Sequence, residues 1–257
     1  MHSSFKAMIT TVSAAIVLSG CASFGPKLDA SRAKSVKTVA IIGFEVQQQQ
    51  PTDNFGINKF KNAVDNGGIQ NSPQYQGMAK NIYETLANNI QQKTKWNVVS
   101  YQKLTANKAY SAFVKEKMEG MRSTSMMGQG AELIPLNGVL DVMAFRKMSM
   151  EQKAAFAKDL GVDAIAEYTV IQSIDQPWMS VGHAVGMASF EYKSRSNLIV
   201  YSPNNEEPLW QIQNVDGQPV SSKGTAEGLS QMERVAKVGS DSAQSSITKM
   251  VENYNVQ

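Results

Sequence analysis

Residues 36–46 read VKTVAIIGFEV, and this stretch decides the fold. Its apolar character is nearly continuous and β-branched residues are frequent in it, which is typical of a strand buried on both faces. Such a strand needs other elements packed against each of its sides. We therefore take it as the first core strand of a layered α/β domain.

Three segments with helical periodicity accompany this strand. Residues 77–94 carry apolar side chains every three or four positions and predict an amphipathic helix. Ser149 and Gln152 form a capping box that opens a second helix, and Gly161 ends it. Residues 229–254 repeat the helical spacing and predict a third, long helix. The apolar stripe of the first helix is Met78, Ile82, Tyr83, Leu86 and Ile90.

Four further segments have strand patterns: residues 96–101, 162–174, 188–201 and 209–215. In the third, apolar residues alternate with charged ones, which indicates one buried and one wet face. The polar break at 203–208 makes the last two strands a hairpin. The predicted fold is an α/β structure of the α+β sandwich type, with a mixed sheet of about five strands covered by about three helices.

The first 20 residues have the order of a bacterial secretory signal. Lys6 precedes an apolar run at 7–18, which is about a dozen residues and shorter than the roughly 20 that a transmembrane helix needs. The run ends in LSGC at 18–21, which looks like the lipobox of bacterial lipoproteins. We expect cleavage between Gly20 and Cys21 and palmitate-type lipidation of Cys21. The alternative is an ordinary signal peptide with a chance cysteine.

Cys21 is the only cysteine of the 257 residues, so no internal disulfide can form. Lipid on this residue would anchor the chain to a membrane. Ala22 stands where an aspartate would favour retention at the inner membrane, so we expect the periplasmic face of the outer membrane. We interpret residues 21–35 as the lipidated cysteine and a tether with an extended reach of roughly 45 Å.

The remaining residues, 36–257, are expected to form a single periplasmic domain. Two polar or weakly periodic segments, about 47–76 and 105–148, are interpreted as inserts. Without Lys6, 24 basic side chains stand against 22 acidic ones. This near-balance, with no cluster of basic and aromatic residues in the sequence, argues against a nucleic-acid partner.

Catalytic patterns are weak. His183 is the only histidine after the signal, so it cannot build a multi-histidine metal site. The S-x-x-K pattern of serine-lysine acylases occurs at 31–34 and 100–103, but the supporting K-T-G element is absent. Asp163 and Glu167 stand four residues apart on a predicted strand, roughly 13 Å, which is too far for a glycosidase pair. We expect a capping or solvated role for both, no enzyme and no cofactor.

The methionines are unevenly distributed. After the signal the chain has 12 of them, and seven lie between Met118 and Met150. Thioethers suit copper(I), and the candidate ligands are Met118, Met121, Met148 and Met150. The alternatives are simple packing and an adaptable surface for a protein partner, since methionine fills irregular gaps.

Three stretches together resemble a known group: KTVAIIGF at 37–44, WNVVS at 96–100 and AFAKDLGVDAI at 155–165. They are similar to the periplasmic lipoproteins that include the CsgG-like curli-secretion channel proteins and share a fold with the TolB amino-terminal domain and the lipoprotein activators of peptidoglycan synthases. The resemblance implies a role in envelope assembly, export or scaffolding without catalysis.

These observations favour a non-catalytic, outer-membrane-anchored periplasmic lipoprotein. Its expected partners are the membrane, through Cys21, and either another envelope protein or copies of itself, with the two inserts as contact surfaces. The alternatives are a component of an oligomeric CsgG-like secretion channel and a methionine-rich copper-binding protein.

Overall fold

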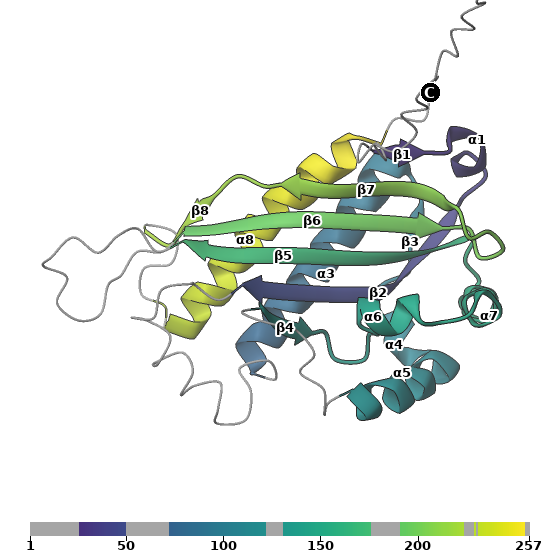
Figure 1. Ribbon diagram of the computed structural model, residues 1–257, viewed down its shortest axis with the longest axis horizontal. Coiled ribbons are helices and arrows are strands. Elements are labelled where there is room, and N and C mark those ends of the chain that lie inside the picture. The colour runs from purple at the N-terminus through teal and green to yellow at the C-terminus, as the bar shows by residue number, and fades with distance from the viewer. Residues whose placement is uncertain are drawn as a thin grey trace, which may run out of the picture.

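The structure is a computed structural model that describes residues 26–49, 72–121, 131–175, 191–223, 229 and 231–254. Within them, eight strands form one mixed sheet in the order β1-β7-β6-β5-β2-β3 (Figure 1). The other two of the eight strands are short and lie off this path: β4 pairs with β2, and β8 pairs with β6.

The strands are β1 (Lys27–Leu28), β2 (Thr38–Gln49), β3 (Asn97–Val98), β4 (Ala131–Pro135), β5 (Ala164–Asp175), β6 (Glu191–Tyr201), β7 (Pro208–Asp216) and β8 (Val220–Ser221). The helices are α1 (Ala30–Ala33), α3 (Pro73–Thr94), α4 (Tyr101–Ala106), α5 (Lys108–Met121), α6 (Val142–Arg146), α7 (Met150–Leu160) and α8 (Gln231–Glu252).

Strand β2 lies inside the sheet and is buried from Val39 to Val46. It runs parallel to β5 on one side and to β3 on the other, and its second half pairs antiparallel with β4. Strands β5, β6 and β7 follow as an antiparallel meander. The predicted doubly buried strand and the predicted β6–β7 hairpin are confirmed.

Helices cover both faces of this sheet. Figure 1 shows α3 and α8 crossing one face and α6 in front of β2 on the other. The predicted α+β sandwich is therefore confirmed. The described residues hold eight strands and seven helices, more than the five and three expected, because the additional elements are too short to produce a clear periodicity in the sequence.

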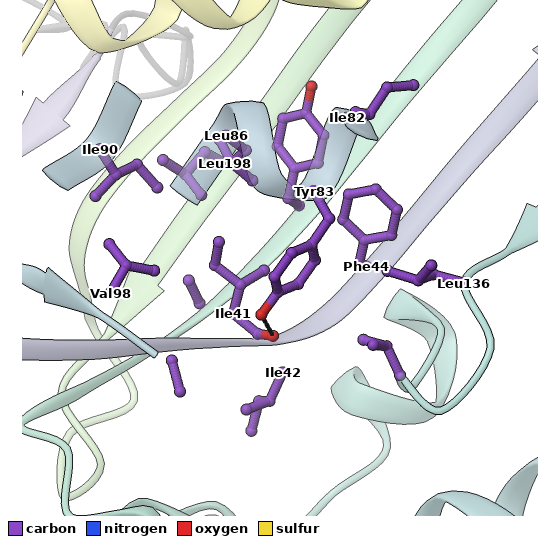
Figure 2. Close-up of a cluster of buried hydrophobic side chains, with 14 of the residues drawn as sticks. Ile41, Ile42, Phe44, Ile82, Tyr83, Leu86, Ile90, Val98, Leu136 and Leu198 are labelled. Carbon is purple, nitrogen blue, oxygen red and sulfur yellow. Dashed lines mark hydrogen bonds between the residues drawn. The ribbon is translucent and has the colours of Figure 1, made fainter. Parts of the chain in front are cut away.

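Aromatic packing joins α3 to the central strands (Figure 2). The Phe44 ring lies edge-on to Tyr83 at 5.4 Å and stacks on Tyr168 at 5.7 Å. The Tyr83 hydroxyl donates to the Ile41 carbonyl oxygen at 3.1 Å, which satisfies a polar group that would otherwise be costly to bury. All five apolar positions predicted for the α3 stripe are buried.

The contact between α8 and β6 is polar at its centre. The Ser194 hydroxyl donates to Ser242 at 2.8 Å, and Ser196 and Ser246 share a hydrogen bond of 2.7 Å. The Gln172 amide donates to the carbonyl oxygen of Gly239 at 2.7 Å. The small side chains of α8 let the helix lie close to the sheet, and their hydroxyls pair with each other rather than remaining unsatisfied.

The capping box is confirmed. The Ser149 hydroxyl accepts from the Gln152 backbone N–H, while the Gln152 side chain accepts from the Ser149 N–H. Gly161 ends α7 in the left-handed conformation at φ 66°. The capping box and the terminal glycine depend only on residues close together in the sequence, so both could be predicted from it.

The inserts are smaller than expected. Residues 47–49 continue β2, and α3 begins at Pro73 rather than at 77. Most of 105–148 forms regular structure, since Tyr110 of α5 and Phe145 of α6 are fully buried. The elements there are short, so the sequence shows no sustained period. Residues 50–71 and 122–130 lie outside the described residues.

The expected tether at 21–35 is also wrong from Lys27 onward. Strand β1 pairs with β7, and the Asp29 backbone N–H donates to the Leu209 carbonyl at 2.9 Å. Two charged side chains of this segment contact each other: Asp29 caps α1, and its carboxylate accepts from the Arg32 guanidinium at 2.7 Å. The backbone and side-chain hydrogen bonds from Arg32 lower the pKa of Asp29 to about 2.

Gly43 provides a test of the packing between β2 and α6. A Cβ at this position would lie 2.9 Å from two side-chain atoms of Phe145, which is itself fully buried. Gly43→Ala should therefore destabilise the fold by about 1–3 kcal/mol through overpacking. The urea unfolding midpoint measures the effect. The control is Gly77→Ala in α3, where a Cβ meets nothing within 4 Å and where alanine should stabilise the helix by about 1 kcal/mol. Equal midpoints for the two variants would contradict the packing.

Candidate functional site

The sheet has two distinct ends, and the beginning of the described chain lies at one of them. Strand β1 and α1 lie beside the C-terminal ends of α3 and α8 (Figure 1). Pro26 is five residues from Cys21, so an extended backbone can separate the two by roughly 17 Å at most. We name this the anchor end.

A pocket of about 560 Å³ opens at the anchor end. Its basic lining comes from two separate parts of the chain, Lys34 and Lys37 after α1 and Lys93 and Lys95 at the end of α3. We call these four side chains and the space between them the lysine pocket. The remaining lining residues are Ala33, Val36, Thr94, Trp96 and Tyr254.

The aromatic residues give the pocket a fixed wall. Trp96 and Tyr254 are 2% and 8% exposed, and their rings pack edge-on at 5.3 Å. Trp210 of β7 contacts both rings, at 6.1 Å and 5.1 Å. This cluster joins the ends of α3 and α8 to the sheet, so the lysines project from a packed base.

No ion pair of the four lysines occurs within the described residues. Asp163 accepts hydrogen bonds from the backbone N–H groups of Lys37 and Thr38 at 2.9 Å each. Those hydrogen bonds outweigh the opposing effect of burial and hold the pKa of Asp163 below its usual value. The carboxylate joins the start of β2 to the start of β5, and it also interacts electrostatically with Lys37. One acid against four lysines leaves the pocket with a net positive charge.

At the other end of the sheet, strand ends that lie next to the undescribed segments of the chain pair with one another. Gln49 pairs with Ala131 and Ser173, and Asp175 pairs with Glu191, which in turn pairs with Ser221. The segments at 50–71, 122–130, 176–190 and 224–228 therefore all begin or end here. We name this the distal end.

Buried carboxylates occur on the α6 side of the sheet between the two ends. Glu45 accepts from the Gln47 amide at 2.6 Å and from the Val142 N–H at 3.3 Å. Glu167 accepts from the Arg146 guanidinium at 2.7 and 2.9 Å. These acids hold α6 on the sheet. Each has a structural partner, and the searched part of the chain holds no group of three acidic, histidine or cysteine side chains placed for a metal.

Asp163 and Glu167, which were considered as a carboxylate pair in the sequence, thus have separate roles. Asp163 caps strand ends, as expected. Glu167 is 2% exposed and ion-paired, so the expectation of a solvated glutamate is wrong, because α6 brings Arg146 over it. Of the S-x-x-K serines, Ser100 caps α4 by accepting from the Lys103 N–H, and Ser31 donates to Asp29.

The candidate copper ligands are not brought together by anything the structure describes. Met148 is buried before the start of α7, and Met150 is half-buried as the first residue of that helix. Met118 and Met121 end α5, but their side chains lie outside the described residues. Met143 is 49% exposed on α6. Cys21, Gly20 and His183 also fall outside the described residues.

Among the residues described, no helix is both long and apolar enough to cross a membrane. The lysine pocket is the feature that sequence reasoning missed. Its only trace in the sequence is two short lysine pairs, 34 with 37 and 93 with 95, separated by more than 50 positions.

No protein-family model matches the chain, and no curated protein matches it. Among solved structures, the crystal structure of lipoprotein GNA1162 from Neisseria meningitidis is similar over 77% of this chain and 91% of that one, with 10% sequence identity and a TM-score of 0.29. The resemblance to CsgG-like and TolB-related proteins stays a prediction.

Glu45 gives a pH-dependent test of the buried carboxylates. Burial raises its pKa above the ordinary 4.5, so the folded protein retains a proton that the unfolded chain loses, and stability falls as pH rises through the folded-state value. Glu45→Gln removes this fall and should gain stability relative to wild type as pH rises above the ordinary value of 4.5, measured by urea midpoints at a series of pH values.

The control for this test is Glu151→Gln. A hydrogen bond with Ser149 lowers the pKa of Glu151, so its carboxylate contributes stability at neutral pH that is lost on acidification. Glu151→Gln should therefore lose stability relative to wild type as pH rises. Parallel pH profiles for wild type and Glu45→Gln would contradict the assignment.

Proposed function

We propose that this chain is a non-catalytic lipoprotein, anchored through lipid on Cys21 to the periplasmic face of the outer membrane, that binds an envelope protein or its own copies. The observation that carries the proposal is the polarity of the sheet. The chain enters the fold at the anchor end, and the segments 50–71 and 122–130 leave it at the distal end.

The distance between the two ends follows from strand geometry. Strand β5 runs 12 residues from the anchor end to the distal end, which is roughly 36 Å at 3.3 Å per residue. With at most roughly 17 Å between Cys21 and Pro26, the anchor end stays near the bilayer. The sheet then presents the distal end to a partner away from the membrane surface.

The contact surfaces that we propose therefore include fewer residues than the two inserts predicted from the sequence. Residues 131–146 supply β4, α6 and buried side chains such as Leu140 and Phe145. Removing them would unfold the core. Segments 50–71 and 122–130 remain the candidates, because the strand residues that flank them, Gln49 and Ala131, are paired with each other.

The first test concerns the anchor. Full-length protein expressed in a Gram-negative host should incorporate labelled palmitate and fractionate with the outer membrane. Cys21→Ala should abolish the label, because this is the only cysteine. Label retained by Cys21→Ala, or none on wild type, would reject the lipidated anchor.

The second test concerns the distal end. Segments 50–71 and 122–130 are replaced, one at a time, by glycine-serine sequences of equal length in the lipidated protein. In-cell crosslinking followed by mass spectrometry should show the loss of a specific partner, or of crosslinks between copies, for at least one replacement. Circular dichroism checks that the fold is kept.

The matched control replaces the exposed turn at 204–206, which lies at the anchor end between β6 and β7. It should retain every crosslink. If both distal replacements also keep all crosslinks, the distal end is not the partner-binding surface.

A further inference from the structure

We propose that the lysine pocket binds the phosphate group of an anionic phospholipid in the membrane to which the chain is anchored. This inference rests on the proposed lipid anchor, since the anchor brings the pocket to the bilayer. It adds a second, non-covalent membrane contact, with a defined site and a defined class of ligand.

The first argument is charge. Four lysines from two separate parts of the chain line one space, and none has an ion pair within the described residues. Bringing like charges together is unfavourable without a counterion. A phosphate supplies that counterion, because lysine ammonium groups bind phosphate as point charges.

Helix ends account for only part of this arrangement. Lys93 and Lys95 lie at the C-terminal end of α3, where cations are favoured by the helix dipole. Lys34 is the C-cap of the four-residue helix α1, and Lys37 lies beyond that helix, so α3 accounts for neither of them. Their convergence on the same pocket is a tertiary feature, produced when β1 and α1 dock on the sheet.

The second argument is position. The segment that carries Lys34 and Lys37 begins a few residues after β1, the first strand of the described chain. A lipid on Cys21 would hold Pro26 within roughly 17 Å of its attachment point. Basic groups attract an anionic membrane surface only within about a Debye length, roughly 8–10 Å at physiological salt. The lysine pocket lies at the anchor end of the sheet, so a tether of at most roughly 17 Å allows it to approach the bilayer that closely.

The third argument is shape. The pocket volume of about 560 Å³ is ample for a glycerophosphate headgroup. The buried Trp96 and Tyr254 rings form a packed wall that does not collapse on the lysines. Occupation of the pocket would also orient the domain, with the anchor end facing the bilayer and the distal end directed away from it.

The test uses the purified full-length lipidated protein in a neutral detergent. Short-chain dihexanoyl phosphatidylglycerol, dihexanoyl phosphatidylcholine and inorganic phosphate are titrated separately, with binding followed by microscale thermophoresis. Wild type should bind the phosphatidylglycerol and not the zwitterionic lipid, and the affinity should fall with added salt. Lys93→Gln with Lys95→Gln should weaken binding roughly fivefold per lysine.

The matched control is Lys147→Gln with Lys223→Gln, which removes the same charge from two exposed lysines outside the pocket. It should bind like wild type. If the Lys93 and Lys95 variant fails to fold, Lys34→Gln with Lys37→Gln replaces it, and loss of affinity is expected there too.

Three results would overturn the proposal: equal binding of both lipids, equal loss in the pocket and control variants, or inorganic phosphate binding as tightly as the phosphatidylglycerol. The last result would assign the pocket to free phosphate. Intact mass of the same sample reports the lipid on Cys21 independently, so an unlipidated chain is distinguished from a pocket that does not bind.

Discussion

The burial of β2 on both faces is the constraint on which the rest of this structure depends. A strand with apolar side chains on both sides can be stable only inside a sheet and under a layer on each face. Helices α3 and α8 supply one layer, and α6 with α7 supplies the other. The contact of Gly43 with Phe145 shows how closely the second layer approaches the strand.

The direction of the strands then gives the domain two different ends. Strands β2 and β5 run parallel, so both begin near the docked N-terminal segment and both end at the distal end. The antiparallel strands β6 and β7 run between the same two ends. The proposed lipid anchor at one end, with the segments 50–71 and 122–130 connected at the other, would suit holding a partner at a set distance from a membrane.

The two ends also differ in charge, but only at the lysine pocket. The chain as a whole is nearly neutral, yet the lysine pocket concentrates four cations where the fold begins. Other acids have close partners: the buried Glu167 pairs with Arg146, and the exposed Asp163 joins two strand ends. Whole-chain composition averages over these places, so it gave no sign of a local electrostatic site.

The sequence by itself determined the long elements of the fold. The β2 strand, the α3 stripe and the Ser149 capping box all depend on residues within one helix or strand, and such local patterns can be read directly. It also identified Cys21 as the candidate anchor, because the lipobox is a contiguous motif. It missed the short elements, whose few residues carry no period, and misread the charged segment at 27–35 as a tether.

Only the tertiary structure decided which distant residues meet. It placed Lys34 and Lys37 beside Lys93 and Lys95, brought Arg146 over Glu167, and aligned Gln49 with Ala131. These contacts arise from the docking of separate elements and from strand register. The free energy that fixes them comes from burial summed over the whole domain, so no short stretch of the chain encodes them alone.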